Sequence, residues 1–147
     1  MSFQVRPFNV VKSVSNIMHA TIGQNNAHSG DRTPAVWFES NSSRILICSA
    51  INGNKNYCYS QKEGIPMNKY STVTIQQIQI SQFGYLYHYQ IFINKVKVLD
   101  VHNQKPQEFD YVKYYLSDPW YLGAKANVRG FQVTTFEHKS MRKFTTE

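Results

Sequence analysis

The sequence predicts an all-β protein, folded as a two-sheet antiparallel jelly-roll sandwich. Tyrosine, phenylalanine, isoleucine, valine and threonine recur in short runs, whereas alanine and leucine are scarce, and this bias favours strands. No segment keeps apolar residues at the three- and four-residue spacing of a helix over several turns. Turn-forming residues separate the short runs, so that roughly eight or more strands fit the chain.

The 147 residues are expected to form one domain, residues 1–147, with a basic tail from about residue 138. This length can bury a core without metals or disulfides, and the 14% of aromatic residues argues against disorder. No run approaches the ~18 apolar residues of a membrane span, and no signal peptide is visible. We therefore expect a protein that is cytoplasmic or non-classically secreted, unless a leader is missing from this sequence.

The chain is basic, with sixteen Lys and Arg against nine Asp and Glu and a formal net charge of +7. Such an excess favours anionic partners such as nucleic acid, sulfated glycans or acidic membrane surfaces. The charges are scattered, except for His138, Lys139, Arg142 and Lys143, which fit a solvated tail. Because no nucleic-acid motif accompanies the charge, the sequence argues against nucleic acid as the partner.

A first hairpin is predicted over residues 44–60, with its turn at 52–54. The turn residues Asn52-Gly53-Asn54 accept positive φ at little steric cost. The resulting register sets Cys48 opposite Cys58, within disulfide reach if the pair is not hydrogen-bonded. Because no secretion signal is visible, we interpret the two cysteines as buried free thiols and keep a disulfide as the alternative.

A second hairpin is predicted over residues 85–101, around the two-residue turn Asn94-Lys95. Its register sets Ile91 opposite Val98. One face is apolar and is expected in the core: Tyr87, Tyr89, Ile91, Ile93, Val96 and Val98. Between the hairpins, the apolar residues of a further strand switch from odd-numbered to even-numbered positions, which predicts a β-bulge near Gln76-Gln77.

Three more strands are predicted at residues 35–39, 111–116 and 126–136. In this order the chain resembles the concanavalin A-like sandwich shared by galectins, laminin G-like modules and pentraxins. The resemblance spans roughly residues 35 to 136 and rests on short motifs: Trp37-Phe38, Gly53-Asn54, residues 65–70, residues 91–96 and residues 128–133. It implies glycan recognition, which is often calcium-free in galectins and calcium-assisted in the other two.

The chain departs from the galectin pattern at the sugar site. A galectin site pairs a His-x-Asn-x-Arg strand with a later Asn and a Trp-x-x-Glu strand, and neither motif occurs in order here. In the turn 94–95, Lys95 stands where Gly is usual. The resemblance therefore implies the sandwich fold but identifies no sugar-binding residue in this chain.

Side chains suited to sugar binding occur in residues 101–104 and 117–121. A pyranose presents a C–H-rich face and a rim of hydroxyls, which match an aromatic ring and planar polar groups. The candidate carbohydrate-binding residues are His102, Asn103, Asp118, Trp120 and Tyr121. Pro119 disfavours helix at the preceding residue, and a Trp in a polar turn often marks a contact surface. In the alternative interpretation, Trp120 folds back to cap the sandwich and Asp118 caps a turn.

The sequence shows no catalytic motif. The acidic residues are spread singly, and neither a nucleophile elbow, a phosphate loop nor a His-Glu-x-x-His helix occurs, so we expect no enzyme and no catalytic residue. Asp100, Asp110 and Asp118 could converge on calcium, but the net positive charge opposes this, and neither a metal nor a cofactor is expected.

These observations favour a non-enzymatic, lectin-like carbohydrate-binding protein whose glycan ligands include acidic or sulfated ones. We expect a homo-oligomer, because linked weak sites gain effective concentration. The alternatives are a structural or adhesive protein-interaction module on the same scaffold and a charge-driven binder of sulfated polysaccharide. Replacing Trp120 with alanine is expected to abolish sugar binding with little change in melting temperature.

Overall fold

The computed structural model describes residues 1–80 and 86–135. Tyr85, Phe136 and the basic tail from residue 138, which belong to predicted segments, lie outside these ranges. The described part contains eleven strands: β1 Ser2–Pro7, β2 Ser15–Thr21, β3 Ala35–Phe38, β4 Ile45–Ile51, β5 Asn54–Ser60, β6 Ser71–Gln79, β7 Tyr87–Ile93, β8 Val96–Asn103, β9 Lys113–Tyr115, β10 Leu122–Gly123 and β11 Ala126–Gln132. Within the same ranges, no helix is long and apolar enough to span a membrane.

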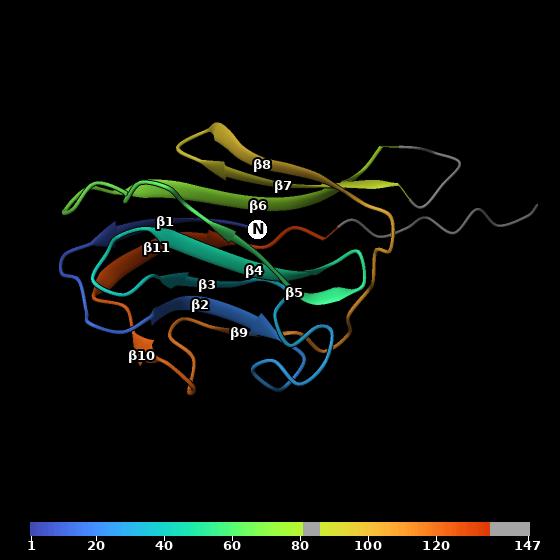
Figure 1. Cartoon of the computed structure of the whole chain (residues 1–147), viewed down its shortest axis with the longest axis horizontal. Coiled ribbons are helices and arrows are strands. Elements are labelled where there is room, and N and C mark those ends of the chain that lie inside the picture. Colours follow the sequence, from blue (N-terminus) through green and yellow to red (C-terminus); the bar gives the residue numbers. More distant parts are fainter. Residues whose placement is uncertain (81–85, 136–147) are drawn as a thin grey trace, which may run out of the picture.

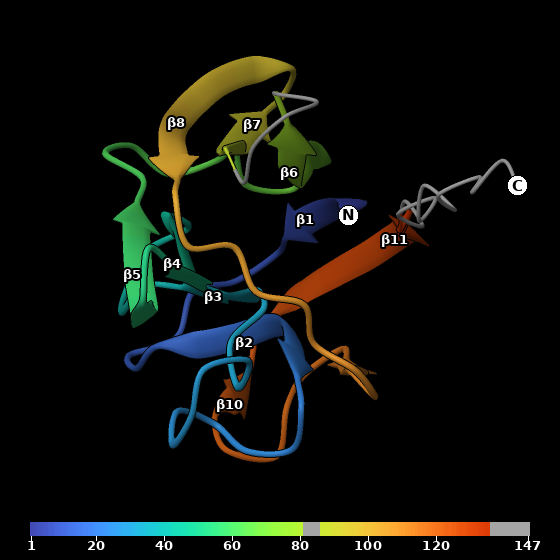
Figure 2. The same cartoon turned by 90° about the vertical axis from the view of Figure 1, so that its right-hand side faces the viewer.

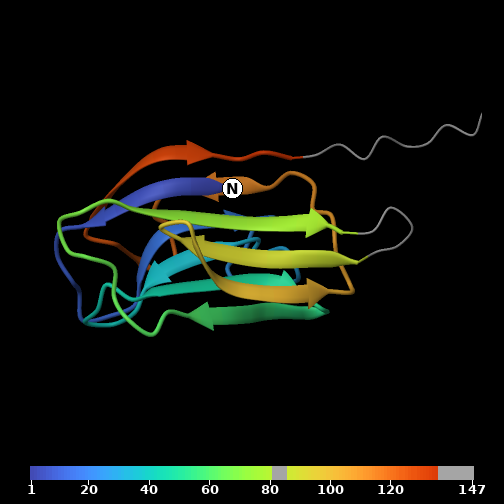
Figure 3. The ribbon, with the colours of Figure 1, turned by 90° about the horizontal axis from the view of Figure 1, so that it is seen from above.

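The strands form two sheets that pack face to face (Figures 1 and 2), which confirms the predicted all-β sandwich. Sheet A has the order β11-β1-β6-β7-β8. Sheet B has the order β10-β2-β3-β4-β5, and β9 also pairs with β2. The ladders between these strands are antiparallel, apart from the two-residue pairing of β10 with β2. The first and last strands are therefore neighbours in sheet A (Figure 3).

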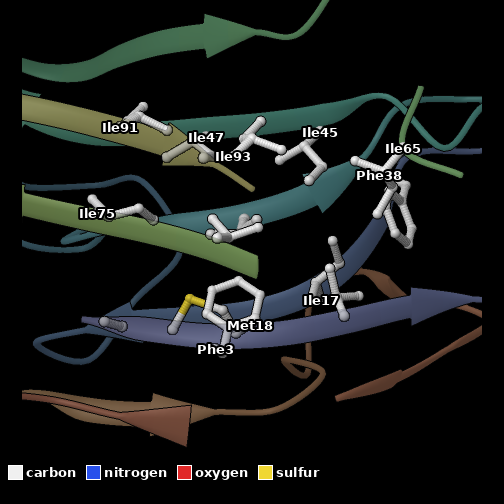
Figure 4. Close-up of a cluster of buried hydrophobic side chains, with 14 of the residues drawn as sticks. Phe3, Ile17, Met18, Phe38, Ile45, Ile47, Ile65, Ile75, Ile91 and Ile93 are labelled. Atoms are coloured by element: carbon white, nitrogen blue, oxygen red, sulfur yellow. The ribbon is translucent and has the colours of Figure 1, made fainter. Parts of the chain in front are cut away.

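The main core lies between the sheets and is built from residues that alternate along each strand. In β1, Phe3 and Val5 are buried, whereas the intervening Gln4 is partly exposed. Isoleucines from both sheets meet the phenylalanines in this layer (Figure 4): Ile17, Ile45, Ile47, Ile75, Ile91 and Ile93. Burial of these side chains supplies the main driving force for packing the two sheets together.

Strands β2 and β3 are buried at every position, not at alternate ones. A second, smaller apolar cluster is formed by Ala35 and Trp37 of β3 with Cys48 of β4, and Tyr121 packs against it. Loops therefore cover the outer face of sheet B at this point. Continuous burial of a strand requires cover on both faces.

The first hairpin has the predicted pairing at the cysteines but a tighter turn, because Ile51 pairs with Asn54 and the register shifts between Ser49 and Ile51. Asn52 and Gly53 have φ values of 53° and 77°, and Cys48 lies opposite Cys58. The interpretation of the cysteines as buried free thiols is wrong, because they form a disulfide and Cys58 is exposed. Their Cα atoms are 4.1 Å apart, the close spacing of directly opposed residues, which brings the two sulfurs together.

The second hairpin departs from its predicted register after the turn. Ile93 opposes Val96 as predicted, but an irregularity between Ile91 and Phe92 shifts the pairing, so that Ile91 faces Leu99. Val96, next to the turn, is 64% exposed, and the prediction that it lies in the core is wrong. A single extra residue moves every later side chain of a strand to the opposite face.

The bulge predicted near Gln76-Gln77 is also absent. Strand β6 pairs with β7 from Val73 to Gln79 without a register shift. The apolar phase change instead leaves Ile78 and Ile80 on the surface, 42% and 47% exposed. Strands β1 and β2 were not predicted from the sequence.

Candidate functional site

The loop of residues 116–121, between β9 and β10, lies against the outer face of sheet B, and Asp118 fixes its shape. The carboxylate Oδ1 accepts hydrogen bonds from the main-chain amides of Trp120 (3.0 Å) and Tyr121 (2.9 Å). The amide of Asp118 itself donates to Oδ1 of Asn16 on β2 at 2.9 Å. The carboxylate thus holds residues 119–121 in a tight turn, as Asp side chains commonly do.

His19 of β2 holds the other oxygen of Asp118. Its Nδ1 lies 2.6 Å from Oδ2, and both side chains are fully enclosed. The Nε2 of His19 donates to the main-chain carbonyl oxygen of Asp31 at 2.6 Å, since a carbonyl can only accept. The imidazole therefore ties two loops, residues 22–34 and 116–121, to β2 of sheet B.

Trp120 stands on this framework with 39% of its surface exposed. The edge of its ring meets His19, with ring centroids 5.2 Å apart, and Tyr115, at 6.1 Å. Trp37, by contrast, is 2% exposed and lies between His19 and Tyr121, at 5.7 and 5.4 Å. The two tryptophans thus have different positions, one inside the cluster and one at its surface.

Arg32 joins the loop of residues 22–34 to β5 and to Tyr121. Its guanidinium lies over the Trp37 ring, 4.9 Å from the centroid. It donates to the main-chain and side-chain oxygens of Asn25, to Oδ1 of Asn56 at 2.6 Å and to the Tyr121 hydroxyl at 3.1 Å. Arg32 is 8% exposed, so it organises its neighbours and is itself enclosed.

The arrangement leaves hydrogen-bonding groups around Arg32, which reaches Tyr121, the residue that follows Trp120 in the chain. Asn25 and Asn56 bind the guanidinium through oxygen, and their side-chain NH₂ groups make no hydrogen bond within the described part of the chain. Asn25, Asn56 and Tyr121 are all half-buried. We call Asn25, Asn56, Trp120 and Tyr121 the Trp120 surface. It combines an aromatic ring with fixed amides and a hydroxyl.

His102 and Asn103 lie on the other sheet, at the end of β8. Asn103 is 1% exposed and donates to Oε1 of Gln77, while its Oδ1 accepts from the amides of Asn52 and Lys105. Its polar atoms are thus engaged inside the protein. The exposed His102 ring meets His88, with centroids 4.5 Å apart. The structure therefore brings together Asp118, Trp120 and Tyr121 and separates His102 and Asn103 from them.

A polar group also surrounds Asp100 on the outer face of sheet A. Its carboxylate accepts hydrogen bonds from Lys97 and Gln90 and lies 2.6 Å from Nδ1 of His88. Lys97 first, and then His88, hold the pKa of the Asp100 carboxyl well below its ordinary value of 3.8. No group of three or more His, Cys, Asp or Glu suited to a metal occurs in residues 1–80 and 86–135, so Asp100, Asp110 and Asp118 do not form one.

Three residues of this framework escaped the sequence analysis: Asn16, His19 and Arg32. A signal does exist for His19, which is the one ionisable side chain in the otherwise apolar and small-residue run Ser15–Thr21. Arg32 offers no such signal, because it lies in a polar loop. Asn56 offers no such signal either, because it lies next to the asparagine-rich turn of the first hairpin.

The two hollows described between the strands lie away from the exposed indole. One, of about 180 Å³, opens between the sheets beside Ser49 and Tyr89, whose hydroxyls are 2.7 Å apart. Burial raises the pKa of Tyr89, so its hydroxyl stays protonated and can donate. The other, of about 210 Å³, lies beneath Leu116 and Ser117 at the β10–β11 edge. No residue of the Trp120 surface lines either hollow.

Comparisons with models of protein families, with characterised proteins and with solved structures found no match for this chain. The resemblance to concanavalin A-like sandwiches stays a prediction from short motifs. The observed two-layer antiparallel architecture agrees with the fold class that the resemblance implies.

Proposed function

We propose that the protein is a non-enzymatic glycan-binding protein and that the Trp120 surface holds the sugar. The observation that carries the proposal is the half-exposed Trp120, held by an anchor that is itself enclosed. Asp118 fixes the main chain of Trp120, and His19 fixes Asp118. An aromatic ring fixed before the ligand arrives loses little conformational entropy on binding.

The chemistry of the surface matches a pyranose. The C–H-rich face of the sugar can lie on the indole, and equatorial hydroxyls can accept from the free NH₂ groups of Asn25 and Asn56. The Tyr121 hydroxyl accepts from Arg32 and can donate to the sugar. Arg32 thus acts as a positioning residue, because its hydrogen bonds orient three of the polar groups offered to the ligand.

The same geometry argues against acid–base catalysis by the enclosed His–Asp pair. Both ring nitrogens of His19 face protein oxygens, and both oxygens of Asp118 are engaged. Neither residue can reach a substrate proton without breaking the turn that it holds. We therefore propose a binding role, in which Asp118 supports the site from within.

A glycan array followed by calorimetric titration tests the proposal. Trp120→Ala is expected to weaken binding of the best array ligand at least tenfold. The matched control is Tyr111→Ala, which removes a 93% exposed aromatic ring outside the Trp120 surface and should leave binding unchanged. An array on which no glycan binds the wild-type protein, or equal losses in both variants, would contradict the proposal.

A specific observation favours a second candidate, a protein-interaction module. Large apolar side chains are exposed along residues 114–122: Tyr114 at 44%, Leu116 at 57%, Leu122 at 56% and Trp120 at 39%. Such clusters often mark protein interfaces. If a second copy of the chain covers them, sedimentation should show an oligomer that Leu116→Ser/Leu122→Ser dissociates. A monomer at all concentrations excludes the homo-oligomer.

A further inference from the structure

Two arginines share one tyrosine ring on the outer face of sheet A. Strand β1 lies between β11 and β6 (Figure 3). Arg6 lies on β1, on the face opposite the buried Val5, while Arg129 lies on β11 and Tyr70 directly precedes β6. The guanidinium carbon of Arg129 lies 3.7 Å from the centroid of the Tyr70 ring, and that of Arg6 lies 5.3 Å from it. We call these three residues the Tyr70 cluster.

The orientation of Arg129 is fixed by a chain of hydrogen bonds across the sheet. Its Nε donates to Oε1 of Gln4 at 2.8 Å, and Nε2 of Gln4 donates to the Thr72 hydroxyl at 3.4 Å. The terminal nitrogens of Arg129 then have no hydrogen-bond partner within the described residues. Nε of Arg6 is buried and also lacks a partner there. The cluster therefore holds guanidinium donors in place without using them.

No acidic group balances these charges in the described structure. Neither Arg6 nor Arg129 forms an ion pair with a described carboxylate, and β1, β6 and β11 contain no Asp or Glu. By contrast, Arg44 pairs with Glu39 and Lys97 with Asp100. The two guanidinium groups repel each other. The attraction of each one to the Tyr70 ring offsets part of this repulsion, and a bound anion would offset the rest.

We infer that the Tyr70 cluster binds an anionic oxygen group, a sulfate ester or a carboxylate, carried by a glycan. Forked guanidiniums match the paired oxygens of such groups. Stacked nucleobases fit less well, because Arg129 already covers the Tyr70 ring. Because the carrier is a glycan, the inference rests on the proposed function. It adds a second site on the opposite layer from the Trp120 surface.

The first test uses the full 147-residue chain with three hexasaccharides: a sulfated one from heparin, a carboxylate-only one from hyaluronan, and neutral chitohexaose. In NMR spectra, the side-chain Nε–Hε signals of Arg6 and Arg129 should shift with the first or second probe and not with the third. The probe that acts distinguishes sulfate from carboxylate. Unmoved arginine signals with both charged probes would overturn the inference.

Variants then separate a built site from general charge attraction. Arg6→Gln/Arg129→Gln should weaken binding of the effective probe about tenfold or more, since charge-assisted hydrogen bonds are lost. Arg129→Lys, which keeps the charge, should still weaken it about fivefold. The control Lys105→Gln removes an exposed charge beyond β8, at the far edge of sheet A, and should change it about twofold or less. Equal losses in the control would overturn the inference.

The outcomes for the two proposals are distinguishable. Trp120→Ala should leave binding at the Tyr70 cluster intact. Neutral glycans that bind through Trp120, together with unmoved arginine signals, would support the proposed function and refute this inference. Arginine shifts of the same size with a DNA oligonucleotide, at similar affinity, would refute the glycan as carrier.

Discussion

Nδ1 of His19 lies 2.6 Å from Oδ2 of Asp118, although the two residues are 99 positions apart in the chain. Both side chains are fully enclosed, so no solvent can replace either of these two atoms as the partner of the other. The pair joins β2 of sheet B to the turn that presents Trp120. Stability and ligand binding are therefore linked at this contact.

Asp118→Ala should lower the free energy of unfolding by about 3–5 kcal/mol, because the enclosed imidazole loses its partner and two main-chain amides lose their acceptor. Urea unfolding followed by tryptophan fluorescence measures the change. The exposed Asp110 provides the control, and Asp110→Ala should stay within about 0.5 kcal/mol of wild type. Equal stabilities of the two variants would show that the buried pair contributes little.

The disulfide should contribute about 2–3 kcal/mol to stability, because it closes a loop of 10 residues in the unfolded chain. Wild-type protein should therefore unfold at lower urea concentration when a reductant is present. Cys48→Ala/Cys58→Ala should unfold at the same urea concentration with and without reductant. A wild type that is insensitive to a reductant shown to break the bond would refute this prediction.

Replacing the two tryptophans should lower the free energy of unfolding by different amounts. Trp37→Ala removes an enclosed ring and should destabilise the protein by about 3–5 kcal/mol. Trp120→Ala removes a half-exposed ring packed on His19 and Tyr115, so about 1–2 kcal/mol is expected, with the fold retained. Thermal unfolding of both variants checks the order. If Trp120→Ala is the more damaging change, the indole belongs to the core.

Asp100 should make stability depend on pH at the acidic end. Its hydrogen bonds lower the pKa of the carboxyl in the folded state, so the ionised form favours folding. This contribution is complete above the ordinary pKa, near 4, and is lost as the pH falls through the lower folded-state pKa. The stability difference between wild type and Asp100→Asn should thus be constant above about pH 5 and shrink in acid. Urea unfolding between pH 2 and 7 measures it, and a difference that is independent of pH would contradict the assignment.

Local chemistry explains what could be predicted from the sequence. The Asn52-Gly53 turn determines its own hairpin, and this hairpin sets Cys48 opposite Cys58 after a register shift next to the turn. The same holds for the segment of Asp118 and Trp120, where a short polar turn placed a Trp at the surface. In each case the decisive contacts lie within about ten residues.

Contacts between distant segments explain what could not be predicted. The irregularity at Ile91 and Phe92 depends on how β7 packs against β8, and no turn residue marks it. Asp118 was predicted to touch the ligand, but His19 and Asn16, from a strand about a hundred residues earlier, engage it inside the protein. Arg32 and Tyr121 are brought together across 89 positions.

The link between Cys48 and Cys58 also affects how the sheet ends. Strand β5 is the last strand of sheet B on its side, and an edge strand can offer main-chain hydrogen bonds to a strand from another molecule. A covalent tie to β4 keeps β5 from peeling away or sliding by one residue, movements that would uncover the inner strands. As long as it stays oxidised, the disulfide therefore protects the edge strand β5 against pairing with an edge strand of a second molecule.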